Sequence, residues 1–255
     1  MLLAIDIGNT NIVLGCMENG EIRVVARIAT DLIKTSDQYC VDIKNMLSIY
    51  DVDLSAIEGV IISSVVPPVL NSCKTAVRKL TGRQPMVVGP GIRTGVNIQM
   101  ENPAAVGSDL IVAAVAALEA YPAPIIIIDM GTATTITAVD KNGSFVGGCI
   151  CPGVKISAEA LSGRTAQLPA ISLESTQKVI GKNTVDAMRS GVMLGAACMI
   201  DGLVDRMQTE LGGNASVVAT GGIARFVLPM CRHEIAYDRD LLLKGLQLIY
   251  NLNKR

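Results

Sequence analysis

The fold is decided by a stretch of sequence that occurs twice, as Leu3-Ala4-Ile5-Asp6-Ile7-Gly8-Asn9-Thr10 and, at an offset of 123 residues, as Ile126-Ile127-Ile128-Asp129-Met130-Gly131-Thr132-Ala133. In both copies an apolar run ends in Asp-x-Gly, which predicts a buried strand, a tight turn and a second strand. The same offset aligns Asn19-Gly20 with Asn142-Gly143, a dipeptide typical of hairpin turns. Two unrelated hairpins are the alternative, but the matched positions favour a duplication.

Helical patterns follow each set of predicted strands. In the first half we expect a helix capped by Ser36, a strand over 58–66, a helix over 68–80 that stops at Gly82, and a helix from Asn102-Pro103 to about Tyr121. In the second half we expect a helix over 183–211, a strand over 217–220 and a last helix over 240–252.

This order of elements indicates the α/β class. Three antiparallel strands followed by crossovers, present twice, suggest a duplicated ribonuclease-H-like fold of the actin and sugar-kinase superfamily, with two similar halves and a cleft between them. Pro122 and Pro124 interrupt the chain between the halves. We therefore expect an N-terminal ribonuclease-H-like domain over 1–121 and a C-terminal one over 122–255.

The composition limits the possible partners. Half of the 255 residues are hydrophobic, the net charge is −1 and there is no Trp, so we expect no nucleic-acid partner. The apolar stretch from Gly191 to Val204 contains Asp201 and is too short to span a bilayer, so we expect no membrane partner. The seven cysteines form no Cys-x-x-Cys pair and accompany one His, which indicates reduced thiols and a cytoplasmic location.

The two Asp-x-Gly turns carry groups that suit phosphate. Gly8 and Gly131 can adopt tight backbone angles and let a phosphate approach the main chain. Asp6 has the oxygen ligands that Mg²⁺ prefers, and Asp129 could bind a cation in the same way. Side-chain donors follow in each copy: Asn9, Thr10 and Asn11 in the first, and Thr132, Thr134 and Thr135 in the second.

A third turn, Thr220-Gly221-Gly222, follows a predicted strand and precedes a predicted helix. Glycines at this place let a flat ligand such as adenine and ribose lie against the backbone. The alternative is a pair of glycines that serves packing alone, and the local sequence does not separate the two interpretations.

Asp109 is a carboxylate beside an apolar run, Leu110 to Leu118. Burial would raise its pKa and make it a better proton acceptor. The alternative is capping, in which Ser108 or Asp109 begins a helix after a turn at Gly107. The local sequence supports both interpretations equally.

Taken together, these motifs resemble the type III pantothenate kinase family almost from end to end. The first phosphate motif of that family resembles Asp6-Ile7-Gly8-Asn9-Thr10-Asn11, and its pantothenate motif resembles Gly107-Ser108-Asp109. Its second phosphate motif resembles Asp129-Met130-Gly131-Thr132-Ala133-Thr134-Thr135, and its adenosine motif resembles Thr220-Gly221-Gly222.

The resemblance implies phosphorylation of pantothenate to 4'-phosphopantothenate by ATP, the first step of coenzyme A biosynthesis. It implies Mg²⁺ near Asp6 and a monovalent cation, K⁺ or NH₄⁺, at Asp129. The implied nucleotide-binding residues are Asp6, Ile7, Gly8, Asn9, Thr10, Asn11, Ile12, Val13, Thr132, Gly221 and Gly222.

The resemblance also implies roles at the acceptor site. Asp109 would take the proton of the pantothenate hydroxyl group. The implied substrate-binding residues are Met100, Gly107, Ser108, Asp109, Leu110 and Thr184. Because the family is dimeric, a homodimer with sites completed at the subunit interface is implied, and the apolar stretch from Gly191 to Val204 suits it.

Two positions depart from the family pattern. Leu110 stands where the family has an Arg after the Asp, and Met100 stands where it has a Tyr. An Arg offers a forked set of donors to a carboxylate, and Leu offers none. Arg93, Arg164 and Arg189 are candidates to replace the missing guanidinium group.

These departures keep three functions open. The leading hypothesis is an active pantothenate kinase whose carboxylate contact comes from another residue. The second is a kinase for another small hydroxyl substrate, since Leu110 and Met100 make the pocket more apolar. The third is a catalytically silent nucleotide-binding regulatory paralogue, and the presence of Asp109 argues against it.

Overall fold

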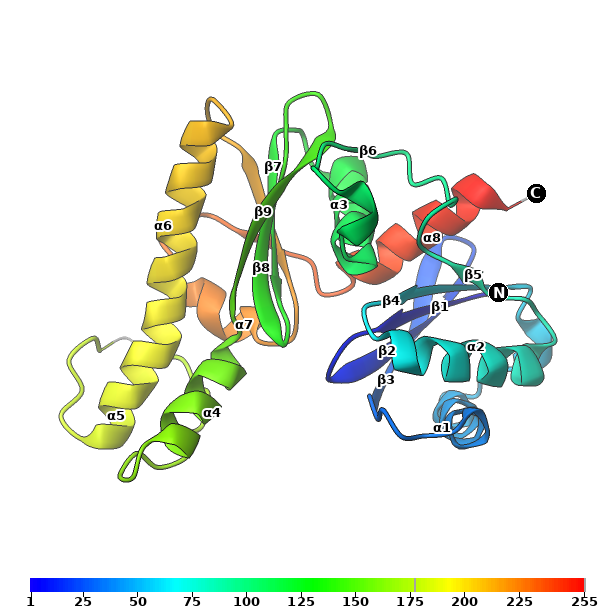
Figure 1. Cartoon of the computed structure of the whole chain (residues 1–255), viewed down its shortest axis with the longest axis horizontal. Helices are drawn as coiled ribbons and strands as arrows, with labels where there is room; N and C mark the ends of the chain where they lie inside the picture. Colours follow the sequence, from blue (N-terminus) through cyan, green and yellow to red (C-terminus); the bar gives the residue numbers. More distant parts are fainter. Residues whose placement is uncertain (177, 255) are drawn as a thin grey trace. The chain divides into compact units, whose positions relative to one another are not determined.

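A mixed β-sheet forms the centre of each of two structural units (Figure 1). The computed structural model describes residues 1–176 and 178–254. Unit 1 comprises Met1–Val96, Glu101–Ala116 and Leu241–Arg255, and unit 2 comprises Asn97–Met100 and Ala117–Asp240.

The sheet of unit 1 has the strand order β3-β2-β1-β4-β5. These strands are β1 (Leu2–Ile7), β2 (Asn11–Glu18), β3 (Glu21–Ala29), β4 (Gly59–Ser64) and β5 (Met86–Val87). β1 runs antiparallel to β2 and parallel to β4, and this register sets Asp6 beside Val13 on one side and Ser63 on the other. The carboxyl ends of β1 and β4 therefore lie at the same edge of the sheet.

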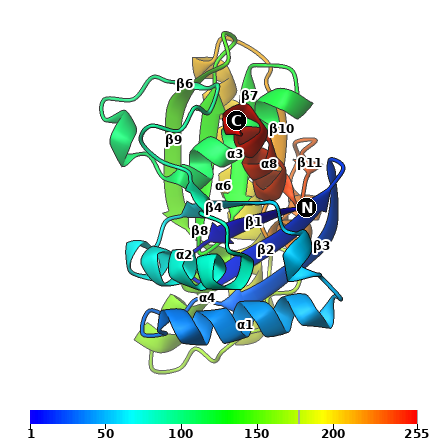
Figure 2. The ribbon, with the colours of Figure 1, turned by 90° about the vertical axis from the view of Figure 1, so that its right-hand side faces the viewer.

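Helices cover both faces of this sheet (Figure 2). On one face, α1 (Ser36–Ile49) and α2 (Pro67–Thr81) pack on a core that includes Leu3, Ile5 and Ile7. On the other face, α3 (Ser108–Ala120) and α8 (Leu241–Asn253) pack on Leu2, Ala4 and Ile61. Because side chains alternate along a strand, Asp6 and Ser63 belong to the face under α3 and α8.

The helix ends in unit 1 follow local chemistry, with two differences from the sequence-based expectation. The cap of α1 is Thr35, not Ser36, and it forms a capping box with Gln38. α2 ends at Gly82 in the left-handed conformation, as predicted. The helix expected from Asn102 is divided into a 3₁₀ turn, η2 (Pro103–Ala105), and α3, and another 3₁₀ turn, η1 (Leu54–Ala56), precedes β4.

The sheet of unit 2 repeats this order as β11-β10-β7-β8-β9, with β6 added beside β9. Its strands are β6 (Asn97–Ile98), β7 (Ile125–Met130), β8 (Ala133–Val139), β9 (Ser144–Pro152), β10 (Ser216–Thr220) and β11 (Ala236–Tyr237). β7 runs antiparallel to β8 and parallel to β10, as β1 does to β2 and β4. The predicted duplicated ribonuclease-H-like architecture is confirmed.

The repeat contains two one-residue differences that cancel. Ile7 pairs with Ile12 across the first turn, whereas Met130 pairs with Thr134 across the second, so the second turn is one residue shorter. The following hairpin is one residue longer: Met17 pairs with Ile22 across the four residues 18–21, whereas Val139 pairs with Phe145 across the five residues 140–144. The two differences restore the offset of 123 residues at the Asn-Gly pairs. Along β8, however, each residue is shifted by one position relative to the residue that this offset assigns to it in β2.

The helices of unit 2 are α4 (Val154–Arg164), α5 (Thr184–Arg189), α6 (Gly195–Glu210) and α7 (Ala224–Val227), with a 3₁₀ turn, η4 (Leu228–Met230), after α7. α5 continues through a π-helical turn, η3 (Ser190–Leu194), into α6. Among the described residues, the run Thr184–Glu210 is long and apolar enough to cross a membrane. One face of this run, which includes Met193, Ile200 and Val204, is buried in the core of unit 2, so packing explains the apolar side chains on that face.

Asp201 is buried in the same helix and accepts hydrogen bonds from the backbone N–H groups of Arg232 and His233.

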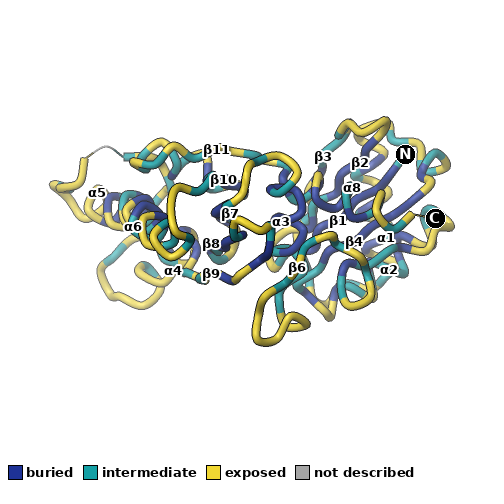
Figure 3. The backbone as a smooth tube through the Cα atoms, turned by 90° about the horizontal axis from the view of Figure 1, so that it is seen from above, coloured by how far each residue is buried: buried dark blue, intermediate teal, exposed yellow. Residues whose placement is uncertain are grey.

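In Figure 3 the central strands of each unit are coloured as buried, while the long connection between α4 and α5 is mostly exposed. The start of α5, residues 184–187, is exposed as well.

The units differ from the predicted domains 1–121 and 122–255 in three places. Residues 117–121 belong to unit 2. α8 belongs to unit 1, because Leu243, Leu246 and Ile249 cover the face of β1 and β4 that would otherwise be exposed. Residues 97–100 belong to unit 2, because β6 pairs with the start of β9. The predicted boundary depended on Pro122 and Pro124. The sequence there gives no signal of the packing of α8 on unit 1 or of the pairing of β6 with β9.

Gly245 of α8 provides a test of this packing. A Cβ atom at this position would overlap the carbonyl oxygen of Val112 on α3, so the two helices approach through glycine. Gly245→Ala should lower the free energy of unfolding by about 1–3 kcal/mol, measured by denaturant titration. Gly163→Ala in α4 is the matched control, because no atom lies within 4 Å of its added Cβ. Equal stability of the two variants would contradict the assignment of α8 to this core.

Candidate functional site

The turn after β1 is held by its own backbone and by Thr30. The N–H group of Gly8 donates to the carbonyl oxygen of Asn11 at 3.0 Å. The hydroxyl group of Thr30 donates to the carbonyl oxygen of Gly8 at 2.6 Å, and its N–H group donates to Thr10 at 3.0 Å. The tip, Asn9 to Asn11, is exposed. The turn thus presents amide and hydroxyl groups to solvent, as phosphate binding requires.

Asp6 lies at the end of β1, directly before this turn, and only 9% of its surface is exposed. Its neighbours on the same face of the strand, Leu2 and Ala4, are apolar core residues. A carboxylate in such surroundings needs a compensating partner or ligand. Its oxygen atoms, beside a turn rich in donors, fit the ligand preference of Mg²⁺.

Ser108 connects the start of α3 to the end of β4. Its hydroxyl group accepts from the N–H group of Ser64 and donates to the carbonyl oxygen of Ser64, both at 3.1 Å. The hydroxyl groups of Ser108 and Ser63 lie 3.0 Å apart. Since Ser63 is the β4 partner of Asp6, these bonds place the first turn of α3 on the Asp6 face of the sheet.

Asp109 follows in that first turn and is half-buried. Burial raises the pKa of its carboxyl group, while hydrogen bonds from backbone N–H groups act in the opposite direction. One carboxylate oxygen accepts the N–H group of Leu110 at 2.9 Å. Asp109 is thus the second residue of α3, and its raised pKa agrees with the interpretation of Asp109 as a proton acceptor.

Gly107 makes room for this carboxylate. A Cβ atom on Gly107 would lie 2.5 Å from Oδ1 of Asp109 and 3.7 Å from the side chain of Val65. Any larger residue would therefore displace the carboxylate from its position over the turn.

The turn after β7 is enclosed by close backbone contacts within unit 2. The N–H group of Gly131 donates to the carbonyl oxygen of Ala133 at 3.0 Å. A Cβ atom on Gly153, before α4, would overlap the carbonyl oxygen of Thr132, and a Cβ atom on Gly221, after β10, would meet the backbone of Met130. Gly221 has φ +96°, which favours glycine. Three separate segments thus meet at the second phosphate motif through glycine.

Asp129 lies between Thr135 on β8 and Thr220 on β10. The hydroxyl oxygen of Thr135 is buried and, within the described part of the chain, has no hydrogen-bond partner. An orphaned oxygen beside a carboxylate suits a cation. Thr134, expected among the phosphate donors, is buried with Met130 and Ile136 on the opposite face, since side chains alternate along β8.

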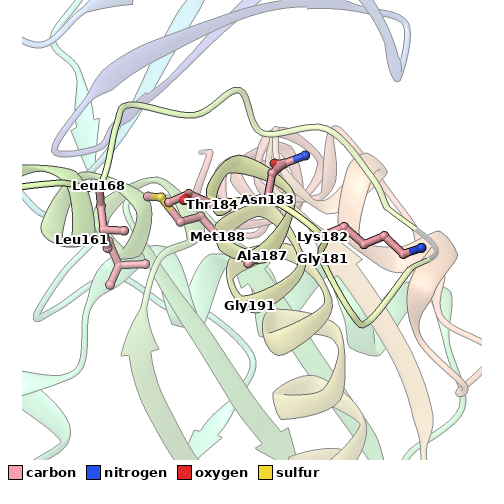
Figure 4. A pocket seen from close by; sticks show the side chains of 9 residues that line it. All are labelled: Leu161, Leu168, Gly181, Lys182, Asn183, Thr184, Ala187, Met188 and Gly191. Carbon is pink, nitrogen blue, oxygen red and sulfur yellow. The ribbon is translucent and has the colours of Figure 1, made fainter.

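Thr184 lies at the start of α5, after its cap Asn183, and lines a pocket of about 550 Å³ in unit 2. Figure 4 shows Leu161, Leu168 and Met188 around the same hollow, with the ammonium group of Lys182 directed away from them. The pocket is thus mainly apolar with a hydroxyl group at its margin.

The two departures from the family pattern lie in different surroundings. Met100 belongs to unit 2, where its sulfur atom would lie 3.2 Å from a Cβ atom on Gly147 of β9. Leu110 belongs to the first turn of α3 in unit 1 and is half-buried. Neither side chain can donate a hydrogen bond to a carboxylate.

The three arginines considered as replacements differ in their contacts. Arg93 donates to the carbonyl oxygen of Leu252 at the end of α8. Arg189 donates to Ser172 and pairs with Asp186. Arg164, the exposed last residue of α4, has no hydrogen bond or ion pair to any residue that the structure describes. Only Arg164 therefore has a guanidinium group without a competing contact.

Sequence reasoning did not identify Thr30, Ser63 or Gly153 as parts of the site. Thr30 and Ser63 lie at strand ends. The signal that could have identified them is a polar residue that follows an apolar run. Gly153 precedes a helix and contacts a turn 21 residues away in the sequence, so only the fold reveals its role.

These elements fit phosphoryl transfer. The first Asp-x-Gly turn has an exposed tip, a carboxylate precedes each of the two turns, and Asp109, whose pKa is raised, lies on the Asp6 face of unit 1. Such a reaction depends mainly on positioning and charge neutralisation, with a base that orients the attacking hydroxyl group.

Comparison with known proteins agrees with this chemistry. A family model for type III pantothenate kinase matches residues 2–206. A type III pantothenate kinase of Moorella thermoacetica is 44% identical over 99% of this chain and 100% of that protein. Another, from an Exiguobacterium species, is 45% identical over the full length of both chains.

Solved structures support the fold. A Baf family protein from Campylobacter jejuni covers 98% of both chains with a TM-score of 0.63 and 18% identity. An activator of 2-hydroxyisocaproyl-CoA dehydratase from Clostridium difficile, with bound ADPNP, covers 97% of this chain and 92% of that one with a TM-score of 0.59 and 16% identity. At these identities the likeness concerns the architecture alone.

The full-length match to curated relatives also decides between the three functions that the sequence left open. The leading hypothesis, phosphorylation of pantothenate by ATP with a divalent metal ion, is the activity of the family. The chain belongs to the type III pantothenate kinase family, which carries out this step of coenzyme A biosynthesis.

Proposed function

We propose that Asp109 is the proton acceptor in the phosphorylation of pantothenate to 4'-phosphopantothenate. The observation that supports this role is the position of its half-buried carboxyl group, with a raised pKa, in a turn tied through Ser108 to the strand beside Asp6. As the pantothenate hydroxyl oxygen attacks the γ-phosphate of ATP, Asp109 accepts its proton. Gly107 keeps the carboxylate of Asp109 in place.

The nucleotide site follows from the two turns. We assign ATP contacts to residues 6–13, to Thr132 and to Gly221 and Gly222, because the tip of the first turn, Asn9 to Asn11, is exposed and no atom lies within 4 Å of a Cβ atom on Gly222. Asp6 would hold Mg²⁺, directly or through water. When bound, Mg²⁺ neutralises charge on the phosphates; the N–H and hydroxyl groups of the turns orient them.

Asp129 is the proposed site of the monovalent cation, K⁺ or NH₄⁺. The buried hydroxyl oxygen of Thr135, beside Asp129 on the neighbouring strand, supports this site, since it lacks a partner among the described residues. The cation would supply positive charge near the second phosphate motif.

The proposed pantothenate pocket uses Gly107 to Leu110, Met100 and Thr184. We assign the carboxylate of pantothenate to Arg164, since Leu110 cannot pair with it and Arg93 and Arg189 already have partners. Met100 and Leu110 would contact the apolar part of the substrate.

A homodimer is also proposed, through the exposed face of the long helix. Gly191, Gly195 and Cys198 are exposed there at helical spacing, and nothing lies within 4 Å of a Cβ atom on either glycine. Such a face allows close approach of a second helix. The seven free cysteines support a cytoplasmic location.

Asp109→Asn tests the base directly. We expect turnover to fall by about 10²–10⁴-fold while ATP binding, measured by calorimetry, stays unchanged. In the wild type, kcat should rise with pH through the raised pKa of Asp109, since the base must be ionised.

The same substitution should not destabilise the protein at neutral pH. A raised pKa in the folded state means that the ionised carboxyl group lowers stability, an effect absent below the ordinary carboxyl range and developed as pH rises through the raised value. Asp109→Asn should therefore melt at the wild-type temperature or higher at pH 7, and the difference should vanish at low pH. Full activity of the variant would exclude Asp109 as the base.

Leu110→Arg tests the departure from the family pattern. A new guanidinium group in the first turn of α3 should lower KM for pantothenate by about tenfold or more, because charged hydrogen bonds contribute about 1.5–3 kcal/mol. Leu110→Met is the control and should leave KM near that of the wild type. An unchanged KM in Leu110→Arg would show that the pocket is organised around Leu110.

Thr135→Val tests the monovalent site with a readout other than activity. K⁺ should raise the melting temperature of the wild type over that in a tetramethylammonium buffer, because bound ligand stabilises the folded state. The valine variant should melt higher than the wild type without K⁺, since an orphaned hydroxyl group is removed, and should gain less from K⁺. An equal gain from K⁺ in both proteins would exclude the Thr135 oxygen as a ligand.

A further inference from the structure

Ser63 is a fully buried hydroxyl group on β4, beside Asp6. The preceding residue on its face, Ile61, belongs to the apolar core under α3 and α8. Burying a hydroxyl group costs about 1–3 kcal/mol unless it finds a hydrogen-bond partner. Ser63 finds Ser108, 3.0 Å away. An apolar side chain would fill this position without the need for a partner, so the hydroxyl group calls for an explanation.

The direction of the hydrogen bond follows from proton counting. Ser108 has one hydroxyl proton, and it goes to the carbonyl oxygen of Ser64. The N–H group of Ser64 donates to one lone pair of the Ser108 hydroxyl oxygen. Ser63 must therefore donate to the remaining lone pair, which completes the bonding capacity of Ser108.

These three bonds fix the rotamer of Ser108, the residue directly before Asp109. The carboxylate of Asp109 folds back over Gly107, with no space for even a Cβ atom between them. A shift of Ser108 would therefore move the carboxylate, because Gly107 to Asp109 form one tight turn. The bond from Ser63 is the only one of the three that comes from a side chain of the sheet face that carries Asp6.

We propose that Ser63 is a positioning residue for proton abstraction: through Ser108, its hydroxyl group holds the carboxylate of Asp109 at a fixed place relative to Asp6. This rests on the proposed role of Asp109 as the base. Small displacements of a reacting group lower the rate strongly, by about 10²-fold for 1 Å. Ser63 touches neither substrate nor nucleotide in this proposal and acts only through its neighbour.

The test compares Ser63→Ala with Ser64→Ala. Both remove one hydroxyl group from adjacent residues of β4. Within the described residues, the hydroxyl group of Ser64 makes one hydrogen bond, which it accepts from the N–H group of Val66. Its loss leaves both backbone groups of Ser64 that hold Ser108. We expect kcat of Ser63→Ala to fall by about tenfold or more, with KM for ATP and the Mg²⁺ concentration for half-maximal rate unchanged. Ser64→Ala should keep its kcat.

Ser63→Thr retains the hydroxyl group and should recover most of the lost kcat. Far-ultraviolet circular dichroism and melting temperatures establish that each variant is folded. A wild-type kcat in Ser63→Ala would overturn the proposal. So would a raised Mg²⁺ requirement with normal kcat at saturation, because Ser63 would then act through Asp6.

Asp109→Asn in the same assay distinguishes a failure of the proposed role of Ser63 from a failure of the proposed role of Asp109. If Asp109→Asn is inactive and Ser63→Ala is normal, the role of Ser63 fails and that of Asp109 stands. If Asp109→Asn retains full activity, Asp109 is not the base, and the proposal for Ser63 fails with it.

Discussion

The parallel pairing of β1 with β4, repeated as β7 with β10, is the constraint on which the site depends. Parallel strands bring their carboxyl ends to the same edge of a sheet. In each of the two sheets, the Asp-x-Gly turn follows the strand at this edge. The pairing sets Asp6 beside Ser63 and Asp129 beside Thr220. A slip of one residue would turn Asp6 to the face under α1 and α2, where the core is apolar.

This arrangement places polar groups where packing alone would favour apolar ones. Asp6 and Ser63 interrupt a face otherwise formed by residues such as Ala4 and Ile61, and burial raises the pKa of Asp109. The free energy of unfolding is thus lower than it would be with apolar residues at these positions. This is common where catalytic groups must be held in a set geometry. The compensation lies in the three hydrogen bonds of Ser108, which are local and directional.

The sequence predicted the repeat, the fold class and most helices, because strand and turn signals are local. It did not predict that α8 packs in unit 1, because the contact of α8 with β1 joins segments more than 230 residues apart. Thr134 was expected at the phosphate, because a constant offset concealed the shorter second turn. The motif around Asp109 was recognised, but Ser63 was not, since a serine at a strand end carries no local signal of its partner.

The place of α8 also bears on the order in which the chain becomes structured during translation. All of unit 2 precedes α8 in the sequence, so it can leave the ribosome before α8 is made. Until then, Leu2, Ala4 and Ile61 lack one of the two helices that cover them, and a nascent chain would expose part of this apolar face. The unit that begins at the first residue is therefore the one whose core is completed last.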